Sequence, residues 1–210
     1  MLTKKEQKLY ILRKISGKMN DLGFHNKVKG QSFLSKISIG MAMIHLGFID
    51  HENDFDVTIS VSIRVDQVED IINKSNDLLK KTEQLKTSTI GCELGNLETG
   101  NQKRFSIYEN TKLDSALEEM IGSIVKTAFP FIKKYSELDN IYNIVKRDDK
   151  ESWWISTIHH KRAQTAIILA KNLNKEDFEI VLNTKRVFLE NRNDYGLELY
   201  LRLCENINKI

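Results

Sequence analysis

A strict alternation of apolar and polar residues runs through the segment FDVTISVSIRVD, from Phe55 to Asp66. Because successive side chains of a β-strand point to opposite faces, this pattern predicts a strand with one buried face and one polar face. The residues on the polar face are Asp56, Thr58, Ser60, Ser62 and Arg64. We expect no other element to cover that face, so that it contacts either solvent or a binding partner.

Two further patterns predict strands. The segment FLSKISIGMAMIHLGF carries apolar residues at odd positions from Phe33, with Gly40 or Gly47 marking a bulge or a close approach. The acidic turn 50–54 would join this strand to the alternating segment as an antiparallel hairpin. A second hairpin is predicted from TIGCEL and KRFSIYE, with its turn between Glu98 and Asn101.

Helical spacing of apolar residues predicts helices between and after these strands. The first helix follows a capping box formed by Thr3 and Glu6. The second follows Asp66, and its apolar stripe is Val68, Ile71, Ile72, Leu78 and Leu79. The third begins after Thr111, and Pro130, the single proline, is expected to end or kink it.

Only helical patterns occur in the last third of the chain. A short helix turns Ile141, Ile144 and Val145 inward, and the mixed-charge stretch 146–151 then suggests a domain boundary. Three helices follow: from Ser152 to about Leu173, from Asn174 to about Glu190, and from Asp194 onward, with Asn174 and Asp194 as N-caps.

This order of elements predicts an α+β fold. We expect an antiparallel sheet of about four strands, built from two hairpins, with helices on one face. Residues 1–147 would form this α+β domain, and residues 148–210 would form an all-α appendage of about three helices.

Composition narrows the class of protein. A formal net charge of +3 over 210 residues does not require a nucleic-acid partner. Cys92 and Cys204 are too few for a disulfide framework, so we expect free thiols in a reducing compartment. Neither a signal-peptide pattern nor an apolar stretch long enough to cross a membrane is present in the sequence. A soluble cytoplasmic protein without a membrane partner is therefore expected.

The charges are unevenly distributed along the chain. Residues 1–30 contain eight Lys or Arg against two acids, and residues 49–70 contain seven acids against Arg64 alone. Such an asymmetry predicts electrostatically distinct faces if the fold keeps the two segments apart.

The sequence carries no motif of established chemistry. It has no phosphate-binding glycine loop, no GxSxG elbow and no HExxH pair. The acids at 50, 52, 54 and 56 alternate as calcium ligands do, but Phe55 replaces the turn glycine and Val61 the closing acid. We therefore assign no catalytic residue, metal or cofactor.

An unusual cluster contains Trp153-Trp154 followed by His159-His160-Lys161-Arg162. On one continuous helix, Trp153 and His160 would share a side, and Trp154 and Arg162 another. The cluster either anchors the helical appendage on the main domain or forms an anion-binding or base-stacking site, since indole and guanidinium groups stack well.

One segment resembles a known family. A helix ending in Leu22-Gly23-Phe24 is followed by a link with Lys27, Lys29 and Gly30, and Phe33 then opens a strand. This order resembles the bacterial family called domain of unknown function 4304, over roughly residues 5–135. The resemblance implies a small bacterial α+β domain of a type suited to binding or toxin immunity. It implies no catalytic residue, because the family has no established activity.

The lack of a catalytic motif, the polar sheet face and the uneven charges favour a non-enzymatic protein-binding module, for instance a toxin-immunity or antitoxin-like protein. Its acidic segments would steer a basic partner protein. The candidate partner-binding residues are Asp50, Glu52, Asp54, Asp56, Thr58, Ser60, Ser62, Arg64, Trp153, His160 and Arg162.

Two alternatives stay open. The first is nucleic-acid binding through the basic first helix and the segment 153–162. The second is an enzyme whose site is assembled from residues scattered along the chain. Candidates for such a site are His45, Glu93, Tyr108 and His159.

Overall fold

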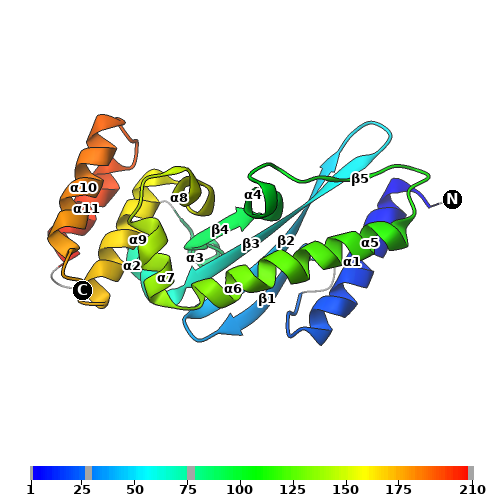
Figure 1. Cartoon of the computed structure of the whole chain (residues 1–210), viewed down its shortest axis with the longest axis horizontal. Helices are drawn as coiled ribbons and strands as arrows, with labels where there is room; N and C mark the ends of the chain where they lie inside the picture. Colours follow the sequence, from blue (N-terminus) through cyan, green and yellow to red (C-terminus); the bar gives the residue numbers. More distant parts are fainter. Residues whose placement is uncertain (1, 27–29, 75–78, 208–210) are drawn as a thin grey trace. The chain divides into compact units, whose positions relative to one another are not determined.

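The computed structural model describes residues 2–26, 30–74 and 79–207 of the chain (Figure 1). Three residues used in the sequence predictions, Lys27, Lys29 and Leu78, lie outside these ranges. No helix in the described ranges is both long enough and apolar enough to cross a bilayer.

The strands are β1 (Ser32–Ile37), β2 (Gly40–Asp50), β3 (Phe55–Val65), β4 (Ile90–Glu93) and β5 (Phe105–Ile107). The helices of the first part of the chain are α1 (Lys4–Asp21), α2 (Asp66–Lys74), α3 (Lys81–Gln84), α4 (Leu94–Thr99), α5 (Leu113–Ser123), the π-helical turn η1 (Ile124–Ala128) and α6 (Phe129–Tyr135). The later helices are α7 (Leu138–Val145), α8 (Lys150–Ile155), α9 (His159–Asn172), α10 (Phe178–Asn191) and α11 (Leu197–Asn206).

These elements confirm the predicted α+β class. The antiparallel sheet has five strands in the order β1-β2-β3-β4, and β5 also pairs with β3. Within the described residues, the elements that follow β5 are all helices.

Contacts group the chain into two compact units. Unit 1 comprises Met1–Ser62 and Cys92–Lys134, and unit 2 comprises Ile63–Gly91 and Tyr135–Ile210. Residues 63–91 join the C-terminal helices because α9 packs against α2 as well as α7. The sequence analysis divided the chain after residue 147, and this grouping differs from that division. The division into an α+β domain and a helical appendage stays a prediction.

The alternating segment forms β3 as expected. The six apolar side chains from Phe55 to Val65 are fully buried. On the polar face, Thr58 and Ser60 are half-buried, whereas Ser62 and Arg64 are each only 9% exposed. The open polar face is therefore confined to the first part of the strand.

The single strand predicted from Phe33 is in fact two strands. β1 and β2 pair across a tight turn, with Phe33 opposite Ile44 and Ile37 opposite Gly40. Gly40 adopts a φ of +147°, which favours glycine. Because the chain reverses at this turn, the fully buried positions on β2 are the even-numbered Ala42, Ile44 and Leu46 rather than Met41 and Met43.

The predicted hairpin between β4 and β5 is wrong, because each of these strands pairs with β3. Helix α4 lies between them instead of a turn. Its N-terminus is capped by the Glu93 carboxylate, which accepts a hydrogen bond from the Gly95 N–H at 3.1 Å. Gly100 ends it in the left-handed conformation, with a φ of +75°.

One predicted helix boundary and one predicted buried helix face are confirmed. The Thr3–Glu6 capping box precedes α1, and Ile141, Ile144 and Val145 are all buried in α7. Pro130 was expected to end or kink the helix, and it does not end it: the π-helical turn η1 finishes at Ala128, two residues before the proline, and α6 continues to Tyr135. A π-helical turn offers a way to accommodate the missing proline N–H.

The helix predicted from Ser152 to Leu173 is broken, so four helices rather than three follow residue 148. The backbone leaves the helical region at Ser156, where φ is −142°, and this separates α8 from α9. Asn174 does not cap α10; with a φ of +50° it ends α9 instead. In Figure 1, α10 and α11 lie side by side and pack on α9.

Two glycines of unit 1 give a matched test of this packing. A Cβ at Gly17, inside α1, would have no neighbour within 4 Å, so Gly17→Ala should stabilise the protein by roughly 0.5–1 kcal/mol. A Cβ at Gly95 would lie 2.3 Å from the Lys103 backbone nitrogen, so Gly95→Ala should destabilise it by about 1–3 kcal/mol. Urea unfolding followed by far-ultraviolet circular dichroism measures both, and equal effects would contradict the close approach at Gly95.

Candidate functional site

The predicted acidic turn of unit 1 is partly neutralised within the molecule. Lys8 Nζ lies 2.6 Å from Asp50 Oδ1, and Lys4 Nζ lies 3.7 Å from the same atom. The hydrogen bond from Lys8 lowers the pKa of Asp50. The fold therefore brings Lys4 and Lys8 of the basic first helix against the acidic turn, so at this point the two segments are not kept apart as distinct charged faces would require.

The last of the four predicted acids, Asp56, also has partners within the protein. It accepts a hydrogen bond from Ser106 Oγ at 2.7 Å, and His51 Nε2 lies 3.1 Å from its other oxygen. Of the four predicted acids, Glu52 stays exposed and Asp54 half-exposed. Only part of the predicted acidic surface is therefore available to a partner.

Thr58 and Ser60 lie on the half-buried face of β3, where Thr58 comes close to β2 at Gly47. A Cβ at Gly47 would lie 2.7 Å from Thr58 Oγ1, so the glycine allows the two strands to present a flat surface there. Ser62 is nearly buried. The partner-binding role of these three residues stays a prediction.

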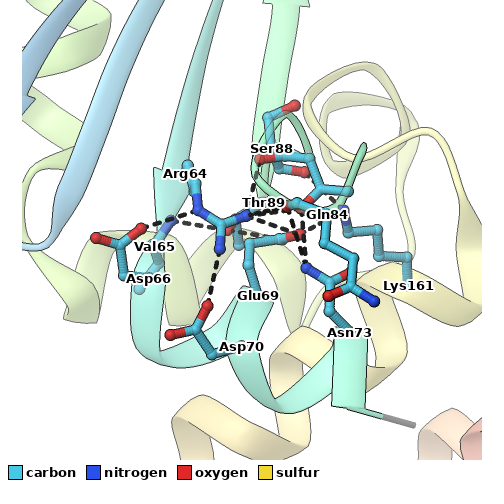
Figure 2. A network of polar contacts seen from close by, with 11 residues as sticks. Arg64, Val65, Asp66, Glu69, Asp70, Asn73, Gln84, Ser88, Thr89 and Lys161 are labelled. Atoms are coloured by element: carbon cyan, nitrogen blue, oxygen red, sulfur yellow. Dashed lines mark hydrogen bonds and ion pairs between the residues drawn. The ribbon is translucent and has the colours of Figure 1, made fainter. Parts of the chain in front are cut away.

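Arg64, expected on the open sheet face, is held inside unit 2. Its guanidinium donates to Asp66 Oδ1 and Asp70 Oδ1, each at 2.9 Å, as Figure 2 shows. It also donates to the Gln84 carbonyl at 2.9 Å and to Thr87 Oγ1 at 2.7 Å. Arg64 thus joins the end of β3 to α2 and to the segment after α3, and the prediction that it is open to a partner is wrong.

A second ion pair ties α2 to α9. The Glu69 carboxylate is fully buried and accepts hydrogen bonds from Thr89 Oγ1 and Lys161 Nζ, both at 3.0 Å (Figure 2). Lys161 also donates to the Ser88 carbonyl at 2.8 Å. This network serves the internal structure of unit 2.

An exposed group of aromatic side chains surrounds Arg192 at the start of the α10–α11 turn. The Arg192 guanidinium lies 5.5 Å from the centre of the Trp153 ring and 5.4 Å from that of Phe188. The His159 ring meets the same two rings edge-on, at 5.9 Å and 5.4 Å between ring centres. Trp153 is 37% exposed, and Arg192 is exposed.

The same turn presents a further aromatic residue. Tyr195 is 83% exposed and packs edge-on against the His160 ring at 4.8 Å between ring centres. Ile158, two residues before His160, is also exposed. We call this surface the aromatic–arginine patch, and it consists of Trp153, Ile158, His159, Phe188, Arg192 and Tyr195.

The His160 side chain is buried against the turn between α10 and α11. It is 8% exposed, and its Nδ1 lies 3.1 Å from Asp194 Oδ1. A Cβ at Gly196 would lie 2.0 Å from the His160 ring, so only glycine permits this approach. The prediction that His160 is available to a partner is wrong, but its contacts hold Tyr195 beside the start of α9.

Beneath the patch, one carboxylate joins two buried cations. Arg162 is fully buried and Lys185 is 1% exposed. Asp148 accepts hydrogen bonds from Arg162 Nη2 at 2.8 Å and from Lys185 Nζ at 2.7 Å. Arg162 also donates to the Ser156 carbonyl at 2.7 Å. Arg162 is therefore not exposed to a partner as expected, because it is fully buried against Phe188 of the patch; its partner-binding role stays a prediction.

These charges change the protonation of their neighbours. Burial lowers the pKa of Lys185 to about 8, although Asp148 opposes the shift. Burial also lowers the pKa of His159, and the positive charges of Arg162 and Arg192 lower it further. His159 is therefore a neutral ring in the patch near neutral pH.

Unit 2 also contains a pocket of about 190 Å³. Its lining residues are Ile72, Asn73, Leu79, Thr87, Ile158, His160, Lys161, Gln164 and Leu199. The volume is below the roughly 300 Å³ of ordinary ligand sites. The Asn73 and Gln164 side chains already donate to main-chain carbonyls. The pocket therefore gives weaker support for a ligand than the patch gives for a macromolecule.

Of the four residues considered for an enzyme, His45, Glu93 and Tyr108 belong to unit 1, whereas His159 belongs to the patch of unit 2. His45 Nδ1 lies 2.8 Å from Ser32 Oγ, Glu93 caps α4, and Tyr108 is exposed just after β5. Among the described residues, no three His, Cys, Asp or Glu side chains gather as metal ligands would. An enzymatic activity stays an untested alternative.

Comparison with protein-family models, curated proteins and solved structures found no match to this chain. The resemblance to domain of unknown function 4304 thus stays a prediction.

Three members of the patch, Phe188, Arg192 and Tyr195, were missed by the sequence analysis. The run Asn191-Arg192-Asn193-Asp194-Tyr195 has the composition of a polar turn, and a tyrosine within it was the one available signal. Their proximity to Trp153 depends on how α10 packs on α9, which no local pattern reveals.

The buried Lys185 predicts an unusual pH dependence. Its pKa is about 8 in the folded protein against 10.5 ordinarily, so between these values the unfolded chain holds more protons and stability rises with pH. Relative to Lys185→Met, the wild type should gain up to about 3 kcal/mol across this window. Both tryptophans lie in α8, so their fluorescence reports urea unfolding of unit 2. A flat difference between the two proteins would contradict the lowered pKa.

Proposed function

We propose that this protein is a non-enzymatic module that binds another protein through the aromatic–arginine patch. The observation that carries the proposal is the exposed Trp153 ring with the exposed Arg192 guanidinium 5.5 Å from its centre; Tyr195, which is 83% exposed, lies three residues after Arg192 in the same turn. Tryptophan, arginine and tyrosine are the residue types that contribute most to binding energy at protein interfaces.

The support beneath these side chains strengthens the proposal. Arg192 stacks on both Trp153 and Phe188, and Tyr195 packs on His160, which Asp194 holds in place. Side chains that are already held in one arrangement lose little conformational entropy on binding. A rigid group of aromatic anchors therefore suits a stoichiometric complex, as in a toxin-immunity or antitoxin-like protein.

The other predicted surfaces support binding less strongly. A basic partner would use the acidic turn, but Asp50 and Asp56 are already paired within unit 1. Nucleic-acid binding would use α1, but Lys4 donates to the His51 carbonyl and Lys8 to Asp50. Both stay alternatives to the patch.

Affinity capture from a lysate of the cells that make the protein tests the proposal, with Trp153→Ala and Ile180→Ala as matched variants. Ile180 is 68% exposed on α10 and is not part of the patch. Wild type and Ile180→Ala should retain one stoichiometric protein partner that survives nuclease. Trp153→Ala should weaken binding by about 30-fold, corresponding to a loss of about 2 kcal/mol. Equal capture by all three proteins would exclude the patch, and solely nuclease-sensitive capture would favour nucleic acid.

A further inference from the structure

Four basic side chains surround the Phe188 ring of the patch. Arg162, Arg192 and Lys185 lie 5.4–6.0 Å from the ring centre, and His159 packs edge-on. Asp148 neutralises only the buried pair, Arg162 and Lys185. Within the part of the chain that the structure describes, the Arg192 side chain has neither a hydrogen bond nor an ion pair; only its backbone N–H is bonded, to the Glu190 carbonyl.

The acids next to Arg192 in sequence, and those next to Trp153 in sequence, already have partners within the protein. Glu190 pairs with Arg186, and Asp194 holds His160 and the Gly196 N–H. Asp149 and Glu151 both pair with Arg147. An exposed arginine that is stacked on aromatic rings but has no carboxylate is suited to accept one from another molecule.

We infer that the partner segment that binds the aromatic–arginine patch is acidic and that one of its carboxylates pairs with Arg192. This inference rests on the proposed protein-binding function. A guanidinium that stacks by its face keeps its N–H donors at the edge, in a fork that matches a carboxylate.

The surroundings of Arg192 also define the neighbours of that carboxylate. Trp153, Ile158 and Tyr195 are exposed at 37%, 44% and 83%. Apolar surface of this kind favours an aliphatic or aromatic side chain beside the acidic residue. The segment is therefore both acidic and apolar, rather than uniformly charged.

A polyanion fits this surface less well. Nucleic acids are held by several cations that reach successive phosphates. Here Arg162 and Lys185 are buried and cannot make such contacts, and Arg147 and Arg186 are paired with acids. Arg192 is then the single unpaired cation of the patch, which suits one carboxylate.

The test is a selection from a random dodecapeptide library displayed on phage. The library is selected on the full wild-type chain and counter-selected on Trp153→Ala, so that peptides bound at the patch are retained. We expect peptides enriched in Asp or Glu next to an apolar residue. The strongest peptide should bind less tightly as salt rises from about 0.05 to 0.5 M, because its carboxylate pair is partly exposed.

Two arginine variants then test the proposed ion pair between Arg192 and a carboxylate of the peptide. Arg192→Glu should weaken the selected peptide by at least about tenfold, whereas Arg186→Glu, on the exposed side of α10, should leave its affinity unchanged. Circular dichroism verifies that both variants are folded. Tryptophan emission from α8 measures the affinity.

The outcomes separate the two proposals. Selected peptides without acidic residues, unaffected by Arg192→Glu, would overturn the acidic partner and leave the protein-binding function standing. Failure to enrich any peptide that depends on Trp153 would overturn both. Tighter binding of a single-stranded oligonucleotide of about 15 nucleotides, lost in Trp153→Ala, would overturn both in favour of nucleic acid.

Discussion

The aromatic–arginine patch depends on the contact of one carboxylate with two buried cations. Arg162 from α9 and Lys185 from α10 are both removed from water, which costs several kcal/mol for each charge unless a partner compensates it. Asp148 supplies that partner to both side chains. The contact fixes α10 against α9 and so sets the position of Phe188, on which Arg192 and His159 pack. The arrangement of the exposed side chains in the patch therefore depends on the pairing of two buried cations with Asp148.

Much of the fold could be predicted because its signals are local. The alternation along β3 and the Thr3–Glu6 capping box lie within a few neighbouring residues, and both were confirmed. The broken helix at Ser156 and the separate pairing of β4 and β5 could not be found in this way. Each of them depends on contacts between distant parts of the chain, which override the local pattern.

The candidate site was predicted less well, for an electrostatic reason. A sequence shows that Arg64 and Arg162 are charged, but it does not show that Asp70 and Asp148 pair with them inside the protein. In the same way, the acidic turn loses part of its charge to α1, whose Lys8 is 42 residues from Asp50. Exposure and pairing together decide which charges can act on a partner, and both are properties of the folded chain.

Asp148→Asn tests the central claim most directly, because it keeps the shape of the side chain and removes its charge. Urea unfolding of unit 2, followed by tryptophan emission from α8, should show a loss of about 3 kcal/mol relative to wild type, since the buried cations Arg162 and Lys185 would lose the one carboxylate that pairs with both. Glu151→Gln, which alters an exposed ion pair with Arg147, should unfold as the wild type does. If Asp148→Asn were as stable as Glu151→Gln, the Asp148 carboxylate would not be what holds the patch in place.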